Sequence, residues 1–135
     1  MAKILIVDDD ALLVRMYQKK LENDGYIVAT ADDGETALQK VQELKPDLIL
    51  LDIMMPKVNG LQMLAILKED KETESIPVIL LTNVGGSDED VNRGLELGAV
   101  AYLVKAGNRP SAVVAKVKEI LAGYVREIPK MKISP

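Results

Sequence analysis

Residues 46–56 read Pro46-Asp47-Leu48-Ile49-Leu50-Leu51-Asp52-Ile53-Met54-Met55-Pro56, and this stretch decides the fold of the 135-residue chain. Its four consecutive apolar residues, 48–51, lie between Pro46 on one side and Pro56 and Gly60 on the other. A short apolar run between turn formers is typical of a strand buried on both faces of a parallel sheet. Asp52 follows at the carboxyl end, where open α/β sheets bind ligands. A buried carboxylate needs a cation or hydrogen bonds, so Asp52 is a candidate functional residue. The alternative is an aspartate that only opens a turn or caps a helix.

Composition limits the classes of function that remain. Apolar residues make up 48% of the chain and the formal net charge is −4, which indicates a folded domain and argues against a nucleic-acid-binding surface. The sequence contains no cysteine and no histidine, which excludes disulfides, thiolate chemistry and imidazole catalysis. A metal would need oxygen ligands, as Mg²⁺, Ca²⁺ and Mn²⁺ prefer. No apolar run approaches the roughly 20 residues of a membrane span, and the amino-terminal residues are too few for a secretory signal. We therefore expect a cytoplasmic protein.

Strand-like and helix-like segments alternate along the chain. Apolar, β-branched runs predict strands at 4–7, 27–31, 48–51, 77–81 and 100–104. Asp10 and Pro110 are suited to begin helices, and Gly25 is suited to end one. The pattern predicts an α/β domain, with a doubly wound five-stranded parallel sheet and helices on both faces. We expect one domain, residues 1–124, followed by a short tail, 125–135. The apolar residues at helical spacing are Leu13, Tyr17 and Leu21; Ala37, Val41 and Leu44; Leu61, Leu64 and Leu67; Val91 and Leu95; and Val113, Val117, Ile120 and Tyr124.

Polar residues follow four of the predicted strands. Asp8 and Asp9 come after the first strand, Asp52 after the third, Thr82 after the fourth and Lys105 after the fifth. All these ends lie on one edge of a parallel sheet. Two carboxylates about 4 Å apart repel each other by roughly 4 kcal/mol, so the cluster calls for a cation, and its oxygen ligands favour Mg²⁺. An aspartate oxygen can attack phosphorus, while a metal and a lysine neutralise the phosphoryl oxygens. Each residue alone also has an ordinary structural explanation, but their joint placement favours phosphoryl transfer.

The chain resembles a response regulator receiver domain of two-component signalling over about residues 3–124. The resemblance implies a flavodoxin-like fold with strand order 2-1-3-4-5. It implies that Asp52 accepts a phosphoryl group from a phosphohistidine on a sensor histidine kinase or phosphotransfer protein. It also implies a phosphoacceptor signalling protein that catalyses its own phosphorylation and dephosphorylation, not an enzyme acting on other substrates. The matching segments are Ile4-Leu5-Ile6-Val7-Asp8-Asp9, residues 46–56 with Gly60, Leu80-Leu81-Thr82, Gly98-Ala99 and Tyr102-Leu103-Val104-Lys105.

The resemblance also assigns roles around Asp52. Asp9, Asp52 and the backbone carbonyl of Met54 would bind Mg²⁺ directly, and Asp8 would assist through a water. Thr82 and Tyr102 would form the switch: Thr82 moves toward the phosphoryl group and Tyr102 turns inward. The fourth helix, fifth strand and fifth helix would then change their preference for a downstream protein target. We expect a stand-alone receiver that signals by protein contact, without nucleic acid or membrane.

The sequence departs from the family pattern near the site. Ala106-Gly107 follows Lys105 where receivers usually carry proline, so we predict a trans Lys105–Ala106 bond, because a cis bond before a non-proline residue costs about 2.5–4 kcal/mol. Asn83 is bulkier than the usual small residue after the switch threonine, and Gly85-Gly86 follows. In receivers, the side chains two positions after the phosphorylated aspartate and two after the switch threonine flank the path of the water that hydrolyses the aspartyl phosphate; here they are Met54 and Val84. Both are apolar, and the absence of a polar group to orient that water predicts slow hydrolysis.

Three other functions stay open. An aspartate-nucleophile phosphatase of the haloacid-dehalogenase type would carry a second aspartate two residues after the nucleophile, where this chain has Met54. A flavin- or nucleotide-binding module would have a glycine-rich turn after the first strand, where this chain has three aspartates. A receiver that only docks, without being phosphorylated, is favoured by nothing except Asn83.

Overall fold

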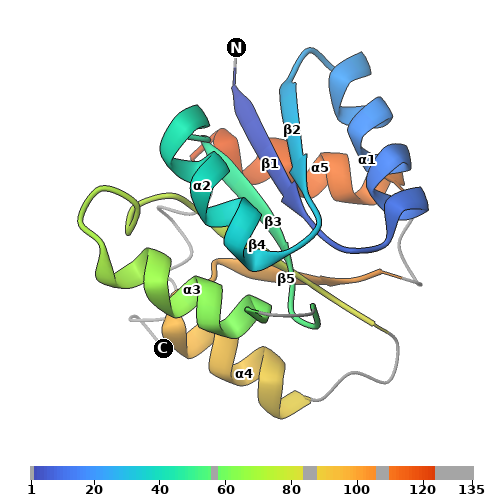
Figure 1. The fold of residues 1–135 in the computed structure, drawn as a ribbon. Helices are drawn as coiled ribbons and strands as arrows, with labels where there is room; N and C mark the ends of the chain where they lie inside the picture. The colour runs from blue at the N-terminus through green and yellow to red at the C-terminus, as the bar shows by residue number, and fades with distance from the viewer. Residues whose placement is uncertain (1, 56–57, 84–87, 106–109, 124–135) are drawn as a thin grey trace.

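The protein alternates strands and helices along its whole described length (Figure 1). The computed structural model describes residues 2–55, 58–83, 88–105 and 110–123. The alternation confirms the predicted α/β class. The elements are β1 (Lys3–Val7), α1 (Ala11–Asn23), β2 (Ile27–Ala31), α2 (Gly34–Leu44), β3 (Leu48–Asp52), α3 (Gly60–Glu69), β4 (Val78–Thr82), α4 (Asp88–Leu97), β5 (Ala101–Val104) and α5 (Pro110–Leu121).

The strands form one parallel sheet in the order β2-β1-β3-β4-β5, which confirms the predicted topology. The register pairs Val7 with Leu51, so Asp8 follows β1 at the level of Asp52. Thr82 pairs with Val104, the residue before Lys105. The polar residues that follow the strands therefore meet at one edge of the sheet, as the sequence predicts.

The sheet separates two apolar layers because successive side chains of a strand point to opposite faces. Leu5 and Val7 of β1 pack with residues of α2, α3 and α4, whereas Ile4 and Ile6 pack with residues of α1 and α5. The central strands β3 and β4 are buried on both faces, which explains their unbroken apolar sequence. Helices on both faces are therefore confirmed.

The helix boundaries follow local capping chemistry. Asp10 caps α1 by accepting a hydrogen bond from Leu13 N at 3.2 Å, and Gly25, with a φ of 96°, lies just beyond its end. α5 begins at Pro110, as predicted. A reciprocal capping box between Asn59 and Gln62, which the sequence analysis did not identify, begins α3.

Residues 68–75 are a polar segment whose side chains bond to the backbone. α3 continues to Glu69, and Lys68 Nζ donates to the carbonyl oxygens of Glu74 at 2.8 Å and Ile76 at 2.9 Å. Thr73 is buried, and its hydroxyl donates to Leu67 O at 2.6 Å. Polar side chains here satisfy backbone carbonyls and close the end of α3.

Two glycines allow helices to approach the sheet closely. A Cβ on Gly60 would lie 2.1 Å from the Asp52 carbonyl oxygen, so only glycine lets α3 begin against the backbone of the candidate residue. A Cβ on Gly94 of α4 would lie 2.2 Å from Leu80 Cδ1.

The helix α4 buries fewer residues than its neighbours. Besides Gly94, Val91 is the only buried residue of α4, whereas α3 and α5 bury four residues each.

Some predictions fall outside the described residues. Tyr124 and the proposed tail, 125–135, are among them, so the division at residue 124 stays a prediction. Among the described residues, no helix is both long and apolar enough to cross a membrane.

Candidate functional site

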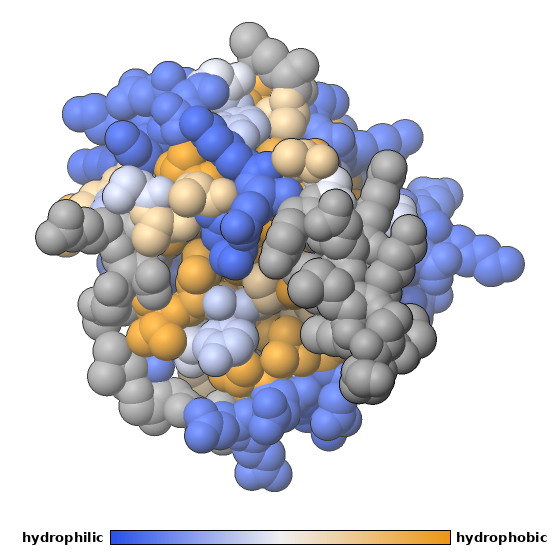
Figure 2. All heavy atoms as spheres, turned by 180° about the vertical axis from the view of Figure 1, so that it is seen from behind, coloured by the Kyte–Doolittle hydropathy of each residue, from blue (hydrophilic) through white to orange (hydrophobic). Residues whose placement is uncertain are grey.

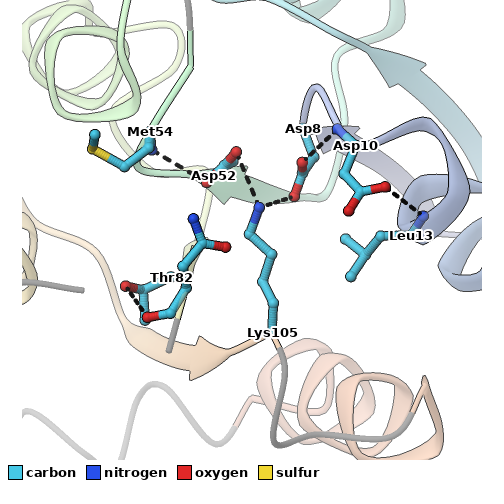
Figure 3. Close-up of polar contacts among 8 residues, drawn as sticks. Asp8, Asp10, Leu13, Asp52, Met54, Thr82 and Lys105 are labelled. Carbon is cyan, nitrogen blue, oxygen red and sulfur yellow. Dashed lines mark hydrogen bonds and ion pairs between the residues drawn. The ribbon is translucent and has the colours of Figure 1, made fainter. Parts of the chain in front are cut away.

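Asp8, Asp52 and Lys105 meet at the carboxyl edge of the sheet (Figure 3). Asp52 is the last residue of β3, and Asp8 and Lys105 directly follow β1 and β5. The two aspartates are almost completely buried, with 2% and 1% of their surface exposed. Lys105 Nζ lies 2.9 Å from Asp8 Oδ2 and 3.1 Å from Asp52 Oδ2. A single ammonium therefore bridges both carboxylates.

Backbone amides hold the other oxygen of each carboxylate. Asp10 N donates to Asp8 Oδ1 at 2.9 Å, and Met54 N donates to Asp52 Oδ1 at 3.2 Å. In both cases the donor is two residues further along the chain, so the turn after the strand fixes the carboxylate. Asp52 is thus oriented by its own backbone before any ligand binds.

The protonation of the site follows from burial and charge. Burial and the neighbouring charge of Asp8 raise the pKa of Asp52 to about 6, although Lys105 and the Met54 amide act in the opposite direction. Burial lowers the pKa of the Lys105 ammonium, but its hydrogen bonds and its attraction to Asp8 and Asp52 outweigh burial and leave that pKa above its ordinary value. At neutral pH the site therefore holds an ionised Asp52 beside a protonated lysine.

Asp8, Asp9 and Asp52 are grouped closely enough to hold a metal ion. One carboxylate oxygen from each lies within 4.8 Å of the others, and Asp9 is exposed whereas the other two are buried. A cavity of about 410 Å³, lined in part by Asp8, Asp9 and Asp32, adjoins the group. Carboxylates that face water on one side suit Mg²⁺, which keeps several water ligands. The residues present therefore fit the ion that the sequence predicts.

Thr82 and Tyr102 do not contact Asp52 through a hydrogen bond in this structure. Thr82 is buried at the end of β4, and its hydroxyl donates to the Asn83 carbonyl at 3.4 Å, a long and weak hydrogen bond. Tyr102 is 48% exposed on the edge strand β5. Their predicted movement is a hypothesis about a second state, to which we return below.

Comparison with known proteins identifies the family. The sequence matches the response regulator receiver domain over residues 4–118. The chain belongs to this receiver family. Membership decides against the phosphatase and the flavin-binding module, and it places the chain in a family of phosphoacceptor modules of two-component signalling. Receiver domains bind Mg²⁺ at an acidic aspartate cluster and interact with histidine kinases and phosphotransfer proteins.

The receiver is similar to the alkaline phosphatase synthesis transcriptional regulatory protein PhoP of Bacillus subtilis, with 45% identity over 121 residues that cover 88% of this chain and 48% of PhoP. It is 40% identical over 119 residues to the phosphate regulon transcriptional regulatory protein PhoB of Klebsiella pneumoniae, covering 88% of this chain and 51% of PhoB. The receiver thus spans about half the length of these curated relatives.

Solved structures agree with the fold of this receiver. A putative response regulator from Chloroflexus aurantiacus superposes with a TM-score of 0.83 at 34% identity, covering 90% of this chain and 98% of that one. The chemotaxis protein CheY4 of Vibrio cholerae gives a TM-score of 0.81 at 31% identity, covering 88% and 98%. These similarities confirm the flavodoxin-like, CheY-type architecture.

Several features of this receiver were missed or stay untested. Sequence analysis assigned Tyr17 to the core and did not find that its buried hydroxyl lies near the acidic cluster, because helical spacing reports only which face a residue occupies. Val84, residues 85–86 and the Lys105–Ala106 bond lie outside the described residues, so the predicted trans bond stays a prediction. Asn83 is exposed, and the role assigned to the Met54 carbonyl also stays a prediction.

Proposed function

We propose that Asp52 of this receiver accepts a phosphoryl group from a phosphohistidine of a sensor histidine kinase or phosphotransfer protein. The observation that carries the proposal is the buried Asp52 carboxylate, held by Met54 N and Lys105 beside Asp8 and Asp9. A carboxylate oxygen attacks phosphorus, the bond from phosphorus to the histidine nitrogen breaks, and that nitrogen keeps its electron pair. The product is an aspartyl phosphate.

The surrounding residues bind the metal and stabilise the negative charge on the phosphoryl oxygens. Asp9, Asp52 and the Met54 carbonyl would hold Mg²⁺, with Asp8 assisting through a water, and the bound ion supplies positive charge to the phosphoryl oxygens. Lys105 already lies 3.1 Å from Asp52, so its ammonium needs only a short movement to pair with a phosphoryl oxygen. The Thr82 hydroxyl donates a hydrogen bond to another of these oxygens. The receiver thereby catalyses its own phosphorylation and later dephosphorylation.

The phosphorylated state acts on a protein target. Thr82 turns from the Asn83 carbonyl toward the phosphoryl group, and the exposed Tyr102 ring turns inward on β5. Apolar side chains already gather across the middle of the face seen in Figure 2, between hydrophilic regions above and below. We place this signalling in the cytoplasm, by protein contact and without nucleic acid or membrane. NMR relaxation dispersion tests the switch, since an absence of exchange and of phosphorylation-induced shifts in β5 contradicts it.

The phosphorylation itself is tested by intact-mass spectrometry after incubation with Mg²⁺ and acetyl phosphate. We expect one acid-stable, base-labile phosphoryl adduct, which Asp52→Asn abolishes. Asp47→Asn is the matched control, because Asp47 accepts a hydrogen bond from Lys3 N at the opposite edge of the sheet. An adduct that persists in Asp52→Asn contradicts the assignment of Asp52. No adduct on the wild-type chain favours the docking module that is never phosphorylated.

A further inference from the structure

Tyr17 carries a buried hydroxyl that the chemistry above does not use. Its side chain is 1% exposed on the inner face of α1, between Val14 and Leu21. Among the described residues the hydroxyl has no hydrogen-bond partner. A buried hydroxyl without a partner destabilises a protein relative to phenylalanine at the same place. The position therefore calls for a state in which the hydroxyl is bonded.

The phenol lies at the functional end of the molecule. α1 begins directly after Asp10, and Tyr17 packs in the same apolar layer as Ile4 and Ile6 of β1, the strand that Asp8 follows. Helical side chains tilt toward the amino terminus of their helix, which here is the end nearest the acidic cluster. Burial and the charge of Asp8 raise the pKa of the Tyr17 phenol, and Lys105 acts on it in the opposite direction. The phenol therefore interacts electrostatically with the Asp8–Lys105 pair and remains protonated at neutral pH, as a donor must.

Asp8 Oδ2 is the complementary acceptor. The Asp8 side chain is completely buried beside Lys105, and its Oδ1 already accepts from Asp10 N. Oδ2 is paired with Lys105 Nζ at 2.9 Å, and the described part of the chain provides it with no second partner. When the lysine turns to a phosphoryl oxygen, this buried carboxylate oxygen loses its donor.

We propose that Tyr17 is a positioning residue whose hydroxyl donates a hydrogen bond to Asp8 Oδ2 in the phosphorylated state, in place of the departed Lys105 ammonium. This inference rests on the proposed function. A carboxylate oxygen accepts from two directions, so Asp8 Oδ2 can receive the hydroxyl and still accept from a water on the metal. The hydroxyl keeps the Asp8 carboxylate oriented while the lysine is paired with the phosphoryl group.

The test compares wild type with Tyr17→Phe, which removes the hydroxyl and keeps the ring. The probe is Mg²⁺ with beryllofluoride, which imitates an aspartyl phosphate. Tyr17→Phe should melt at the same or a higher temperature in the metal-free form, yet bind the probe about tenfold more weakly, as expected for loss of a hydrogen bond to a charged group. The red shift of tyrosine absorbance on binding should be larger for wild type than for the variant, because the Tyr17 phenol gains an anionic acceptor in wild type, whereas the inward turn of Tyr102 contributes equally to both. Tyr26→Phe, at the other end of α1, is the matched control.

Three outcomes overturn the inference. If the affinity of Tyr17→Phe for the probe is within twofold of the wild-type affinity, the hydroxyl makes no hydrogen bond that stabilises the active state. A clear loss of stability in metal-free Tyr17→Phe shows that the hydroxyl is already bonded in the resting state. Failure of wild type itself to bind the probe defeats the proposed phosphorylation of Asp52 and, with it, this role. The first two results leave the proposed function intact.

Discussion

Asp52→Asn tests the electrostatics of the acidic cluster in the absence of metal. The substitution keeps the shape of the side chain but removes its negative charge. Asp52 is only 1% exposed, its charge lies near that of Asp8, and Lys105 compensates it only in part. Although an interaction is deleted, we expect the metal-free variant to be more stable than wild type at pH 7–8. The physical reason is that burial and the charge of Asp8 together outweigh the attraction of Lys105, as the raised pKa of Asp52 shows.

The magnitude follows from the pKa of about 6 in the native state against an ordinary value of 3.8. At about 1.4 kcal/mol for each pH unit, this difference amounts to about 3 kcal/mol of unfolding free energy. Between pH 4 and 6 native Asp52 keeps a proton that the unfolded chain has released. The native state therefore binds more protons in this window, and its stability falls as the pH rises from about 4 to about 6. Above that window the full penalty remains.

Urea denaturation in EDTA, at intervals from pH 4 to pH 8, measures the effect. The free energy of unfolding of wild type should decline between pH 4 and pH 6. That of Asp52→Asn should decline less, and at pH 7.5 it should exceed the wild-type value by up to about 3 kcal/mol. Asp47→Asn, which alters a carboxylate at the other edge of the sheet, should not exceed wild type. The reasoning is refuted if Asp52→Asn is less stable than wild type at pH 7.5 in EDTA.

Three further substitutions test Mg²⁺ binding, the lifetime of the aspartyl phosphate and the close packing of α3 against the backbone of Asp52. Asp9→Ala should raise the melting temperature in EDTA by relieving repulsion and should lose the stabilisation that Mg²⁺ gives wild type; a lower melting temperature in EDTA would count against the clustered carboxylates. Met54→Asn should speed loss of phosphate after donor removal by up to about 100-fold, because the amide can orient the attacking water, and an unchanged rate would show that Met54 does not set the lifetime. Gly60→Ala should lose about 1–3 kcal/mol or more of stability in thermal unfolding, because its Cβ meets the Asp52 carbonyl oxygen at 2.1 Å; a stability within 0.5 kcal/mol of wild type (about the noise of a surface substitution) would contradict the close approach.

The sheet could be predicted from sequence because its central strands leave little ambiguity. Leu48–Asp52 and Val78–Thr82 are buried on both faces, so each strand can be recognised from its own apolar run, and each ends in a polar residue at the same edge of the sheet. Asp8, Asp52 and Lys105 were identified as a group for the same reason. Parallel topology alone brings such residues together, whatever the details of the loops.

The ion pairs and hydrogen bonds of individual side chains were harder to predict from the sequence. The repulsion among the aspartates was expected to require a metal, but the structure shows that the ammonium of Lys105 pairs with both Asp8 and Asp52 and offsets part of that repulsion. The hydrogen bonds of Lys68 and Thr73 were not predicted, because composition does not reveal which backbone carbonyls lie within reach. These contacts depend on distances that no periodicity in the sequence encodes.

The sparse anchoring of α4 has a consequence for local unfolding. Its two buried residues are Val91 and a glycine with no side chain to interlock with the sheet, whereas α3 and α5 each insert several branched or long side chains. Segments with few buried apolar contacts open at a smaller free-energy cost than the domain as a whole. Amide hydrogens of α4 should therefore exchange with deuterium sooner than those of α3 and α5. The helix over Leu80, two residues before Thr82, can then detach and reseat without unfolding the rest of the domain.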